Sequence, residues 1–131
     1  MTRINVIPPK ELVNKHLLAE YRELPRIFGY SKSLQAKGIT PDRVQISKEY
    51  ILGKGHVKFF SDNGVFLMKR QRDIIKELLE RGYNIKHTDV GSLSDGLNIE
   101  WMKDYTPTQN DMIVNKKRID DRLRTMKVNA A

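Results

Sequence analysis

The first residues of the chain carry the group with the most unusual reactivity in this sequence. Thr2 is small, and an initiator Met before a small residue is commonly removed, which would leave the Thr2 α-amine at the start of the chain. An α-amine has a pKa of about 7.7–8.0, so roughly a tenth to a sixth is neutral at pH 7, against about one in 2500 for a lysine. Arg3 would lower that pKa further by like-charge repulsion. The amine is therefore a candidate nucleophile, and the alternative is a frayed terminus without a function.

Glu23 is an acidic residue between two arginines, Arg22 and Arg26. On a helical wheel it lies on the same side as His16, away from the apolar stripe. A carboxylate near a neutral amine can move protons and can stabilise positive charge that develops at a sugar carbon. The alternative is a surface ion pair between Glu23 and Arg26, which would contribute only about 0.2–0.5 kcal/mol.

The chain is strongly basic, with 24 Lys and Arg against 16 Asp and Glu among 131 residues and a formal net charge of +8. The positive charge gathers at both ends and in residues 31–60, whereas residues 61–100 are nearly balanced. A basic excess of this size in a small domain favours a polyanionic partner, most often nucleic acid. For any single lysine, a solvated surface position is the alternative.

Composition also excludes several classes of function. There is no cysteine, so there is no disulfide framework, thiol nucleophile or thiolate metal site, and the three histidines lack the spacing of zinc ligands. No apolar run approaches the ~18 residues of a membrane span, and the first residues do not form a signal-peptide pattern. We therefore expect a cytoplasmic protein with no membrane partner and no metal site.

The candidate residues must be positioned by helices. Apolar residues recur at helical spacing over residues 10–28, and Pro25 should kink or split this segment. A second helix is expected over residues 64–81, with Gly82 at its C-terminal cap.

A third helix is expected to begin at Thr106-Pro107. Residues 39–62 are expected to be mostly loop with a short helical turn, and residues 83–105 to be irregular. No segment alternates clearly enough to form a sheet. We predict an all-α fold, a single compact domain over residues 1–131 with about three helices and long ordered loops. The predicted inner faces contain Val13, Leu17, Tyr21, Leu24 and Phe28 in the first helix, Leu67, Met68, Ile74, Ile75, Leu78 and Leu79 in the second, and Met112, Ile119, Leu123 and Met126 in the third.

Three polar residues on these helices need an explanation. Gln71 falls at the centre of the second apolar stripe, where an unpaired amide costs about 1–3 kcal/mol. It either makes a structural hydrogen bond to a loop carbonyl or contributes to binding. Arg118 and Arg122 lie four apart on the third helix and should repel unless an anion lies over them. Asp121 partly relieves that repulsion, so a solvated face is the alternative.

Several short segments carry a resemblance to a known family. In the first 29 residues they are Met1-Thr2-Arg3-Ile4-Asn5, His16-Leu17, Ala19-Glu20-Tyr21-Arg22-Glu23-Leu24-Pro25-Arg26 and Phe28-Gly29. Further along they are Ile51-Leu52-Gly53, Gly55-His56-Val57, Phe59-Phe60, Phe66-Leu67, Lys69-Arg70-Gln71, Arg81-Gly82 and Asn84-Ile85-Lys86. On these residues the chain closely resembles the pyrimidine-dimer DNA glycosylases.

The resemblance implies a monomeric, all-α glycosylase with a coupled abasic-site lyase that needs no metal or cofactor. Its substrate would be double-stranded DNA containing UV photoproducts or abasic sites. In that family the amine, here on Thr2, attacks C1′ of the damaged nucleotide, and the resulting imine permits β-elimination. Glu23 matches the family's essential carboxylate. Family members also extrude a base opposite the lesion into a pocket of the protein.

The resemblance further implies a set of residues that contact DNA around the active site. Arg3, Arg22 and Arg26 match phosphate and lesion contacts, and His16 and Tyr21 match positions that line the site. Arg118 and Arg122 match the family's basic DNA-contacting face. Gln71 is added as a DNA-contacting candidate from its place in the apolar stripe, not from the resemblance.

One departure from the family concerns lesion recognition. Family members end in a tail rich in Trp and Tyr, whereas this sequence has no aromatic residue after Tyr105. Stacking groups of this kind are worth about 1–3 kcal/mol each. An abasic-site lyase with altered or broader lesion specificity therefore remains an alternative, as does a non-catalytic basic DNA-binding protein.

Overall fold

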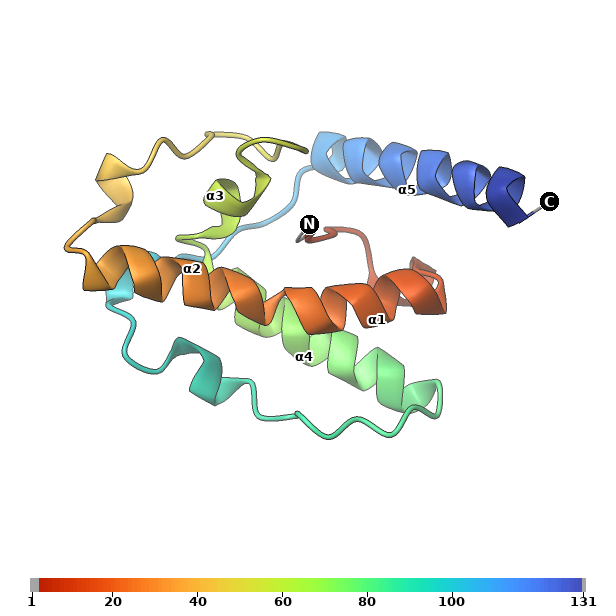
Figure 1. Cartoon of the computed structure of the whole chain (residues 1–131), viewed down its shortest axis with the longest axis horizontal. Coiled ribbons are helices and arrows are strands. Elements are labelled where there is room, and N and C mark those ends of the chain that lie inside the picture. The colour runs from red at the N-terminus through yellow and green to blue at the C-terminus, as the bar shows by residue number, and fades with distance from the viewer. Residues whose placement is uncertain (1–2, 131) are drawn as a thin grey trace.

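Two consecutive helices form one long, nearly continuous rod. The computed structural model describes residues 3–130, and in it α1 covers Asn14–Glu23 and α2 covers Pro25–Ala36. Pro25 has no N–H to continue the hydrogen-bond ladder, but it suits the first position of α2. The backbone of Leu24 stays helical, so the two helices remain in line (Figure 1). The predicted split at Pro25 is confirmed.

The predicted start of the first helix is wrong. Pro9–Glu11 form only a short 3-10 turn, η1, and Leu12 and Val13 are extended before α1 begins. This extended stretch lets Leu12 bury its side chain in the core and leaves Val13 40% exposed. Val13 therefore does not belong to the inner face of the helix.

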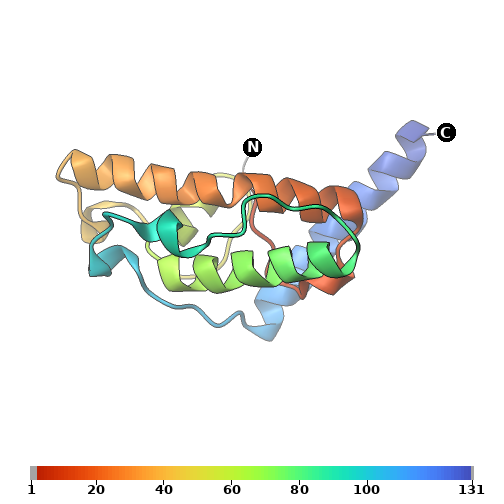
Figure 2. The same cartoon turned by 90° about the horizontal axis from the view of Figure 1, so that it is seen from below.

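The helix α4 covers Gly64–Glu80 and lies alongside α1 (Figure 2). It ends at Gly82 as predicted, because the φ of +90° at Gly82 turns the chain out of the helix. The N–H groups of Gly82 and Tyr83 then donate to the carbonyls at the end of the helix, each at 3.0 Å. The sequence pattern places Leu79 on the inner face of α4, but this side chain is 50% exposed.

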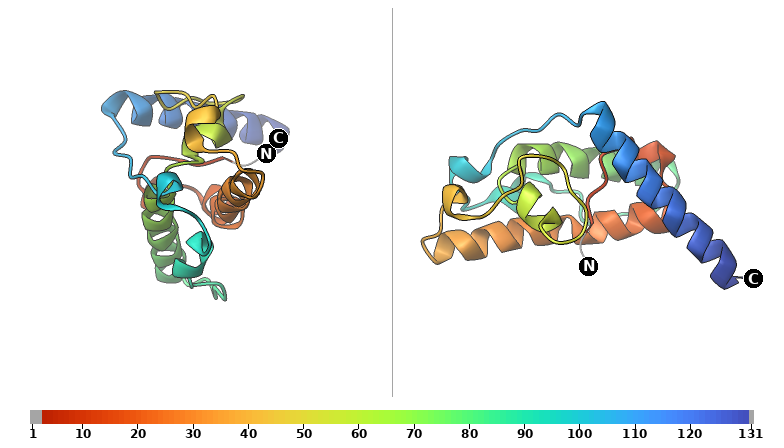
Figure 3. Two further views of the ribbon diagram at one scale, coloured as in Figure 1. Left: turned by 90° about the vertical axis from the view of Figure 1, so that its left-hand side faces the viewer. Right: turned by 90° about the horizontal axis from the view of Figure 1, so that it is seen from above.

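The helix α5 covers Gln109–Ala130 and begins later than the sequence predicts. The Asp111 N–H donates to Thr108 Oγ1 at 3.1 Å, and the Thr108 N–H donates to Asp111 Oδ2 at 3.0 Å. This reciprocal capping starts the helix after Thr108, so Thr106-Pro107 is not its first turn. Figures 2 and 3 show α5 crossing the molecule obliquely, with its C-terminal part projecting beyond the other helices.

A short helix, α3, covers His56–Phe60 and lies within the segment expected to be mostly loop with a short helical turn. Phe59 and Phe60 pack edge-on against Tyr50, with ring centroids 6.1 and 6.0 Å from that of Tyr50. The short helix is thus held in place by an aromatic cluster. Residues 3–130 contain no strand, and the all-α prediction is confirmed: the rod, α4 and α5 are the three long helical elements.

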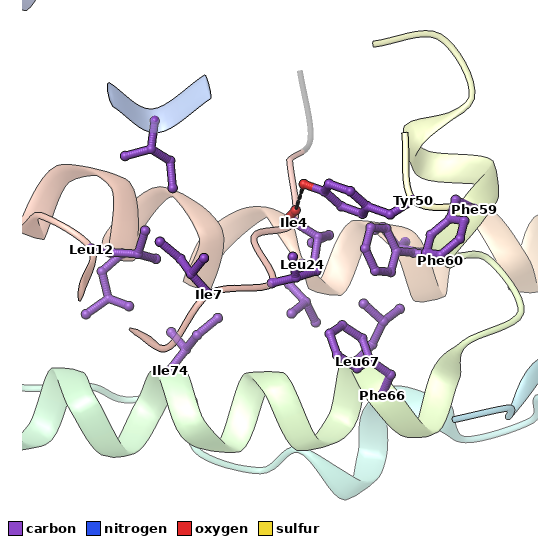
Figure 4. Close-up of a cluster of buried hydrophobic side chains, with 14 of the residues drawn as sticks. Ile4, Ile7, Leu12, Leu24, Tyr50, Phe59, Phe60, Phe66, Leu67 and Ile74 are labelled. Atoms are coloured by element: carbon purple, nitrogen blue, oxygen red, sulfur yellow. Dashed lines mark hydrogen bonds between the residues drawn. The ribbon is translucent and has the colours of Figure 1, made fainter. Parts of the chain in front are cut away.

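The core lies between the rod, α4 and residues 4–7, which run through the middle of the molecule (Figure 4). Its most deeply buried apolar side chains are Ile4, Leu17, Leu24, Ile27, Phe60, Leu67, Ile74 and Leu78. Burying residues 4–7 in this way fixes the path of the chain where Arg3 leaves the core. In the part of the chain that the structure describes, no helix is long and apolar enough to cross a membrane.

Candidate active site

Residues 4–7 are anchored by a fully buried side chain of α5. Asn115 Oδ1 accepts the N–H of Val6 at 2.6 Å and that of Ile7 at 3.3 Å. The Asn115 amide also donates to Asn5 Oδ1 at 2.8 Å. Because residues 4–7 belong to no helix or strand, these side-chain bonds satisfy backbone groups that would otherwise be buried without partners.

A buried ion pair extends this network to α1 and α4. Glu20 Oε1 accepts from Asn5 Nδ2 at 2.8 Å, and the Glu20 carboxylate accepts two N–H groups of Arg70 at 2.7 and 3.0 Å. Arg70 also donates to the Ile7 carbonyl. The N-terminal segment, α1, α4 and α5 are therefore joined by one continuous set of polar contacts.

A pocket of about 270 Å³ opens beside Asn5, lined by the N-terminal segment, α1 and α5. Five of the predicted site residues line it, namely Arg3, His16, Glu23, Arg118 and Arg122. The helices explain this convergence, because side chains three or four residues apart share a helix face. His16 and Glu23 reach the pocket from α1, and the two arginines of α5 reach it from the other side.

The electrostatics of this pocket favour an anion. Burial lowers the pKa of Arg3, and Arg122 lowers it further, whereas Glu23 raises it. Burial lowers the pKa of His16 as well, with smaller contributions from Arg122 and Lys15, so this ring is neutral at pH 7. Its Nδ1 is buried and has no hydrogen-bond partner among the described residues. The pocket thus holds positive guanidinium groups, one neutral imidazole and few carboxylates.

Glu23 forms no ion pair within 4 Å with any described side chain of residues 3–126. The alternative interpretation, a surface pair with Arg26, is therefore not what the structure has. Glu20, the other acidic residue of the lining, is already bound to Arg70. A half-buried carboxylate without a salt bridge can accept a proton from a bound molecule.

A second, larger pocket of about 600 Å³ lies on another side of α1, between α1, α4 and residues 86–93. Three predicted residues line it: Tyr21, Arg22 and Gln71. Apolar side chains such as Ile75 make up much of its remaining wall. A cavity whose wall combines apolar surface with polar side chains is typical of a site that binds a small molecule in one orientation.

The role of Gln71 in this wall follows from Pro25. In a continuous helix the Tyr21 carbonyl would accept the N–H of residue 25, but proline has none. Gln71 Nε2 donates to that carbonyl instead, at 3.1 Å. The expected structural hydrogen bond is therefore present, although its acceptor lies in α1 and not in a loop. Gln71 Oε1 is buried and has no partner among the described residues.

Two predicted residues fall outside both pockets. Arg26 is exposed on α2 and lines neither cavity. Thr2 lies outside the described residues, although it is covalently next to Arg3, which lines the smaller pocket. Within residues 3–130 no group of three or more acidic or histidine side chains could hold a metal ion.

Four residues that hold the site together are not among the residues predicted from the sequence: Asn5, Glu20, Arg70 and Asn115. A signal was present at Glu20, which lies three residues after Leu17 and four before Leu24, both fully buried. An acidic residue at such a core position requires a buried cationic partner. Arg70 shows the same pattern, between Leu67 and Ile74.

The comparison with protein families agrees with the residues that gather here. The family model described as pyrimidine dimer DNA glycosylase matches residues 1–90, more than two-thirds of the chain. The match includes Arg3, His16 and Glu23 of the smaller pocket and Tyr21 and Gln71 of the larger one. The chain therefore belongs to the pyrimidine dimer DNA glycosylase family.

Proposed function

We propose that this protein removes pyrimidine dimers from UV-damaged duplex DNA with its Thr2 amine and then cuts the DNA strand as a lyase. The family supplies the glycosylase activity and the DNA substrate. The observation that carries the finer proposal is the smaller pocket, whose lining includes both Arg3, the neighbour of Thr2, and Glu23, which pairs with no described cation. We further propose that the protein acts as a monomer.

The chemistry begins with the neutral amine. Its nitrogen attacks C1′ of the damaged nucleotide, and the base leaves with the electrons of the glycosidic bond. Loss of a proton from nitrogen and opening of the sugar ring give an imine at C1′. The imine draws electrons from C2′, so a base can remove a C2′ proton while the 3′ phosphate leaves. Water then hydrolyses the imine and releases the amine.

In this proposal Glu23 is the catalytic acid–base group. Its carboxylate receives protons and stabilises the positive charge that develops at C1′. His16, neutral at pH 7 because its pKa is lowered, offers a hydrogen bond to the opened sugar and adds no charge to the pocket. Proton transfer by a positioned side chain contributes about 10²–10⁴-fold to a rate.

The arginines hold the DNA backbone in this reaction. Arg3, Arg118 and Arg122 surround the pocket and bind the phosphates beside the damaged sugar. Arg22 and Arg26, which are both exposed, contact the backbone further from the reacting carbon. Asp121 does not neutralise the face of Arg118 and Arg122, because it forms an ion pair with Arg124.

The larger pocket is suited to a base that leaves the helix when the DNA is bent. Its volume of about 600 Å³ exceeds that of a single purine, and its apolar wall would pack against the face of the ring. The unpaired Gln71 Oε1 would accept a hydrogen bond from an exocyclic amine. Tyr21, whose hydroxyl donates to the His87 carbonyl at 3.1 Å, closes one side of this pocket.

A second candidate is an abasic-site lyase with a different or broader lesion range. The α5 segment that brings Arg118 and Arg122 to the pocket contains no aromatic residue, so it offers no ring to stack on a damaged base, which favours this alternative. The amine and Glu23 would act in the same way on either substrate.

A nicking assay with two duplexes separates these functions. The proposal predicts cleavage of both UV-irradiated DNA and DNA with a preformed abasic site. Cleavage of the abasic duplex alone would indicate an abasic-site lyase that does not remove pyrimidine dimers. Cleavage of neither duplex would indicate a non-catalytic DNA-binding protein. The Glu23→Gln variant should bind both duplexes with unchanged affinity and cleave them about 10²–10⁴-fold more slowly.

A further inference from the structure

His56 makes a contact with the N-terminal segment that the proposed chemistry has not used. The Ile4 N–H donates to His56 Nε2 at 2.9 Å, and His56 Nδ1 lies 2.8 Å from the Ile51 carbonyl. Because Nε2 is an acceptor, the proton of the ring must be on Nδ1, which donates to Ile51. His56 is only 4% exposed and lies at the start of α3.

Both backbone groups of Ile4 are held from the same side. The Tyr50 hydroxyl donates to the Ile4 carbonyl at 3.4 Å, as the dashed line in Figure 4 shows. The His56 ring is itself fixed by edge-on packing against Tyr50 and Phe60, with centroids 5.7 and 5.2 Å away. Ile4 is 1% exposed, so no solvent replaces these bonds if they are broken.

The position of Ile4 limits where the nucleophile can go. Two residues of chain span at most about 7 Å, so the Thr2 amine must act close to the point where Ile4 is fixed. Arg3, the residue between them, lines the pocket that contains Glu23. His56 does not line that pocket, so its effect on the reaction must pass through the backbone of Ile4.

We propose that His56 is a positioning residue: by accepting the Ile4 N–H, it fixes the backbone from which the Thr2 amine reaches the damaged sugar. This inference rests on the proposed function. A nucleophile held in a defined position reacts faster than one on a mobile segment, because less orientational freedom is lost at the transition state. Losing the anchor should therefore slow formation of the covalent intermediate and leave DNA affinity unchanged.

The surroundings of His56 keep its ring in the form that can accept this bond. Burial lowers its pKa, the Ile51 carbonyl opposes that shift, and Arg3 of the N-terminal segment adds to it. Glu20 of α1 has a small opposing effect. Tyr50 is the titratable group in ring contact with His56, and burial raises the pKa of its phenol, so it stays neutral. A neutral His56 is thus available at neutral pH.

Two substitutions of His56 test the proposal. Both remove the imidazole ring, but each keeps a different one of its two hydrogen bonds. Gln places a terminal amide near the position of Nε2, so His56→Gln keeps an acceptor for the Ile4 N–H. Asn places its amide near Nδ1, so His56→Asn keeps the bond to the Ile51 carbonyl and loses the one to Ile4. The measurement is the single-turnover rate at which borohydride traps protein on abasic duplex, with the dissociation constant for the same duplex measured in parallel.

We expect His56→Asn to trap at least about 10-fold more slowly than His56→Gln, since a freed segment loses orientation. Dissociation constants and melting temperatures should be similar in the two variants. Equal trapping rates, or a slow rate that follows weaker DNA binding, would overturn the role of His56. If wild-type protein itself is not trapped, the proposed function fails, which is a separate result.

A backbone change provides the same test where His56→Asn fails to fold. Replacing Ile4 by its α-hydroxy analogue turns one amide into an ester and removes the N–H without changing any side chain. The same replacement at Ile113, an exposed position of α5, is the control for the ester itself. The Ile4 ester should reduce the trapping rate about 10-fold relative to the Ile113 ester at equal DNA affinity. Equal rates would contradict the proposal.

Discussion

Glu20 and Arg70 form an ion pair with both side chains almost completely buried, 1% and 6% exposed, and with Nε and Oε2 2.7 Å apart. Glu20 also accepts a hydrogen bond from Asn5, so the ion pair joins α1 and α4 to the N-terminal segment that leads to the pocket. A buried charge is tolerated only when its partner and hydrogen bonds are present.

Removing one partner of this pair should be far more damaging than removing both. Arg70→Met leaves the Glu20 carboxylate buried without a cation, which should lower the free energy of unfolding by about 3–5 kcal/mol. Replacing both residues, as Glu20→Leu with Arg70→Met, should recover much of that stability because no charge is left buried. Urea denaturation measures both effects. If the double variant is as unstable as Arg70→Met, the buried charge without a partner is not what destabilises Arg70→Met.

The bond between Gln71 and the Tyr21 carbonyl predicts a dependence on Pro25. Gln71→Leu removes the donor and should cost about 1–3 kcal/mol, because it leaves that partly buried carbonyl unpaired. In a Pro25→Ala background the alanine supplies a backbone N–H that can donate to the same carbonyl, so Gln71→Leu should cost less there. Thermal or urea unfolding of the four proteins gives the coupling. Additive effects would mean that Gln71 does not substitute for the missing N–H.

The two faces of α5 should differ in how they bind DNA. Arg118 and Arg122 line the pocket, whereas Arg124 lies on another face and pairs with Asp121. Changing Arg118 or Arg122 to Gln should weaken DNA binding and reduce the slope of log affinity against log salt by about 1 for each phosphate that the protein no longer neutralises. Arg124→Gln, with the same change in net charge, should leave that slope nearly unchanged. Equal slopes for the three variants would indicate only a general effect of charge.

The lowered pKa values of His16 and His56 predict a decrease of stability in acid. In the unfolded chain both rings take up a proton near pH 6.5, whereas the folded protein keeps them neutral to lower pH. The unfolded state therefore binds more protons below about pH 6.5, and the free energy of unfolding falls as the pH drops through that region.

Urea midpoints measured from about pH 7.5 to about pH 5 check this, and the buried His56 can contribute at most about 1.4 kcal/mol per pH unit. His56→Gln should show a weaker decline over this range than wild type, and the exposed His87→Gln should match wild type. A decline that is identical in all three proteins would assign the acid sensitivity to other groups.

The boundaries of the helices show what local patterns can predict. Pro25 divides the rod because it lacks a backbone N–H, and Gly82 terminates α4 because its φ is positive. Both effects belong to the residue itself and can therefore be predicted from the sequence. The start of α5 is harder to predict because Thr106-Pro107 and Thr108 are both acceptable caps, and only the reciprocal bonds with Asp111 decide between them. Periodicity alone assigns Val13 and Leu79 to the core, and both face solvent.

The composition of the pocket could be anticipated only in part. His16 and Glu23 share a face of one helix, and so do Arg118 and Arg122, and this follows from spacing. The face of α1 and the face of α5 come together at Arg3 because α5 packs over the N-terminal segment. Asn115 makes this contact by accepting the Val6 N–H, and the two residues are 109 positions apart in the sequence. The partnership of Gln71 with the Tyr21 carbonyl likewise requires α1 and α4 to lie side by side.

We propose that the Thr2 nitrogen becomes covalently attached to deoxyribose, and mass spectrometry of the trapped complex can identify the attached atom. Protein that begins with Thr2 is incubated with abasic duplex, reduced with borohydride and digested, and the modified peptide is sequenced. We expect a deoxyribose adduct on the α-nitrogen of Thr2 and no adduct when Met1 is retained. An adduct on a lysine side chain, or trapping that is equally efficient with Met1 in place, would contradict this proposal.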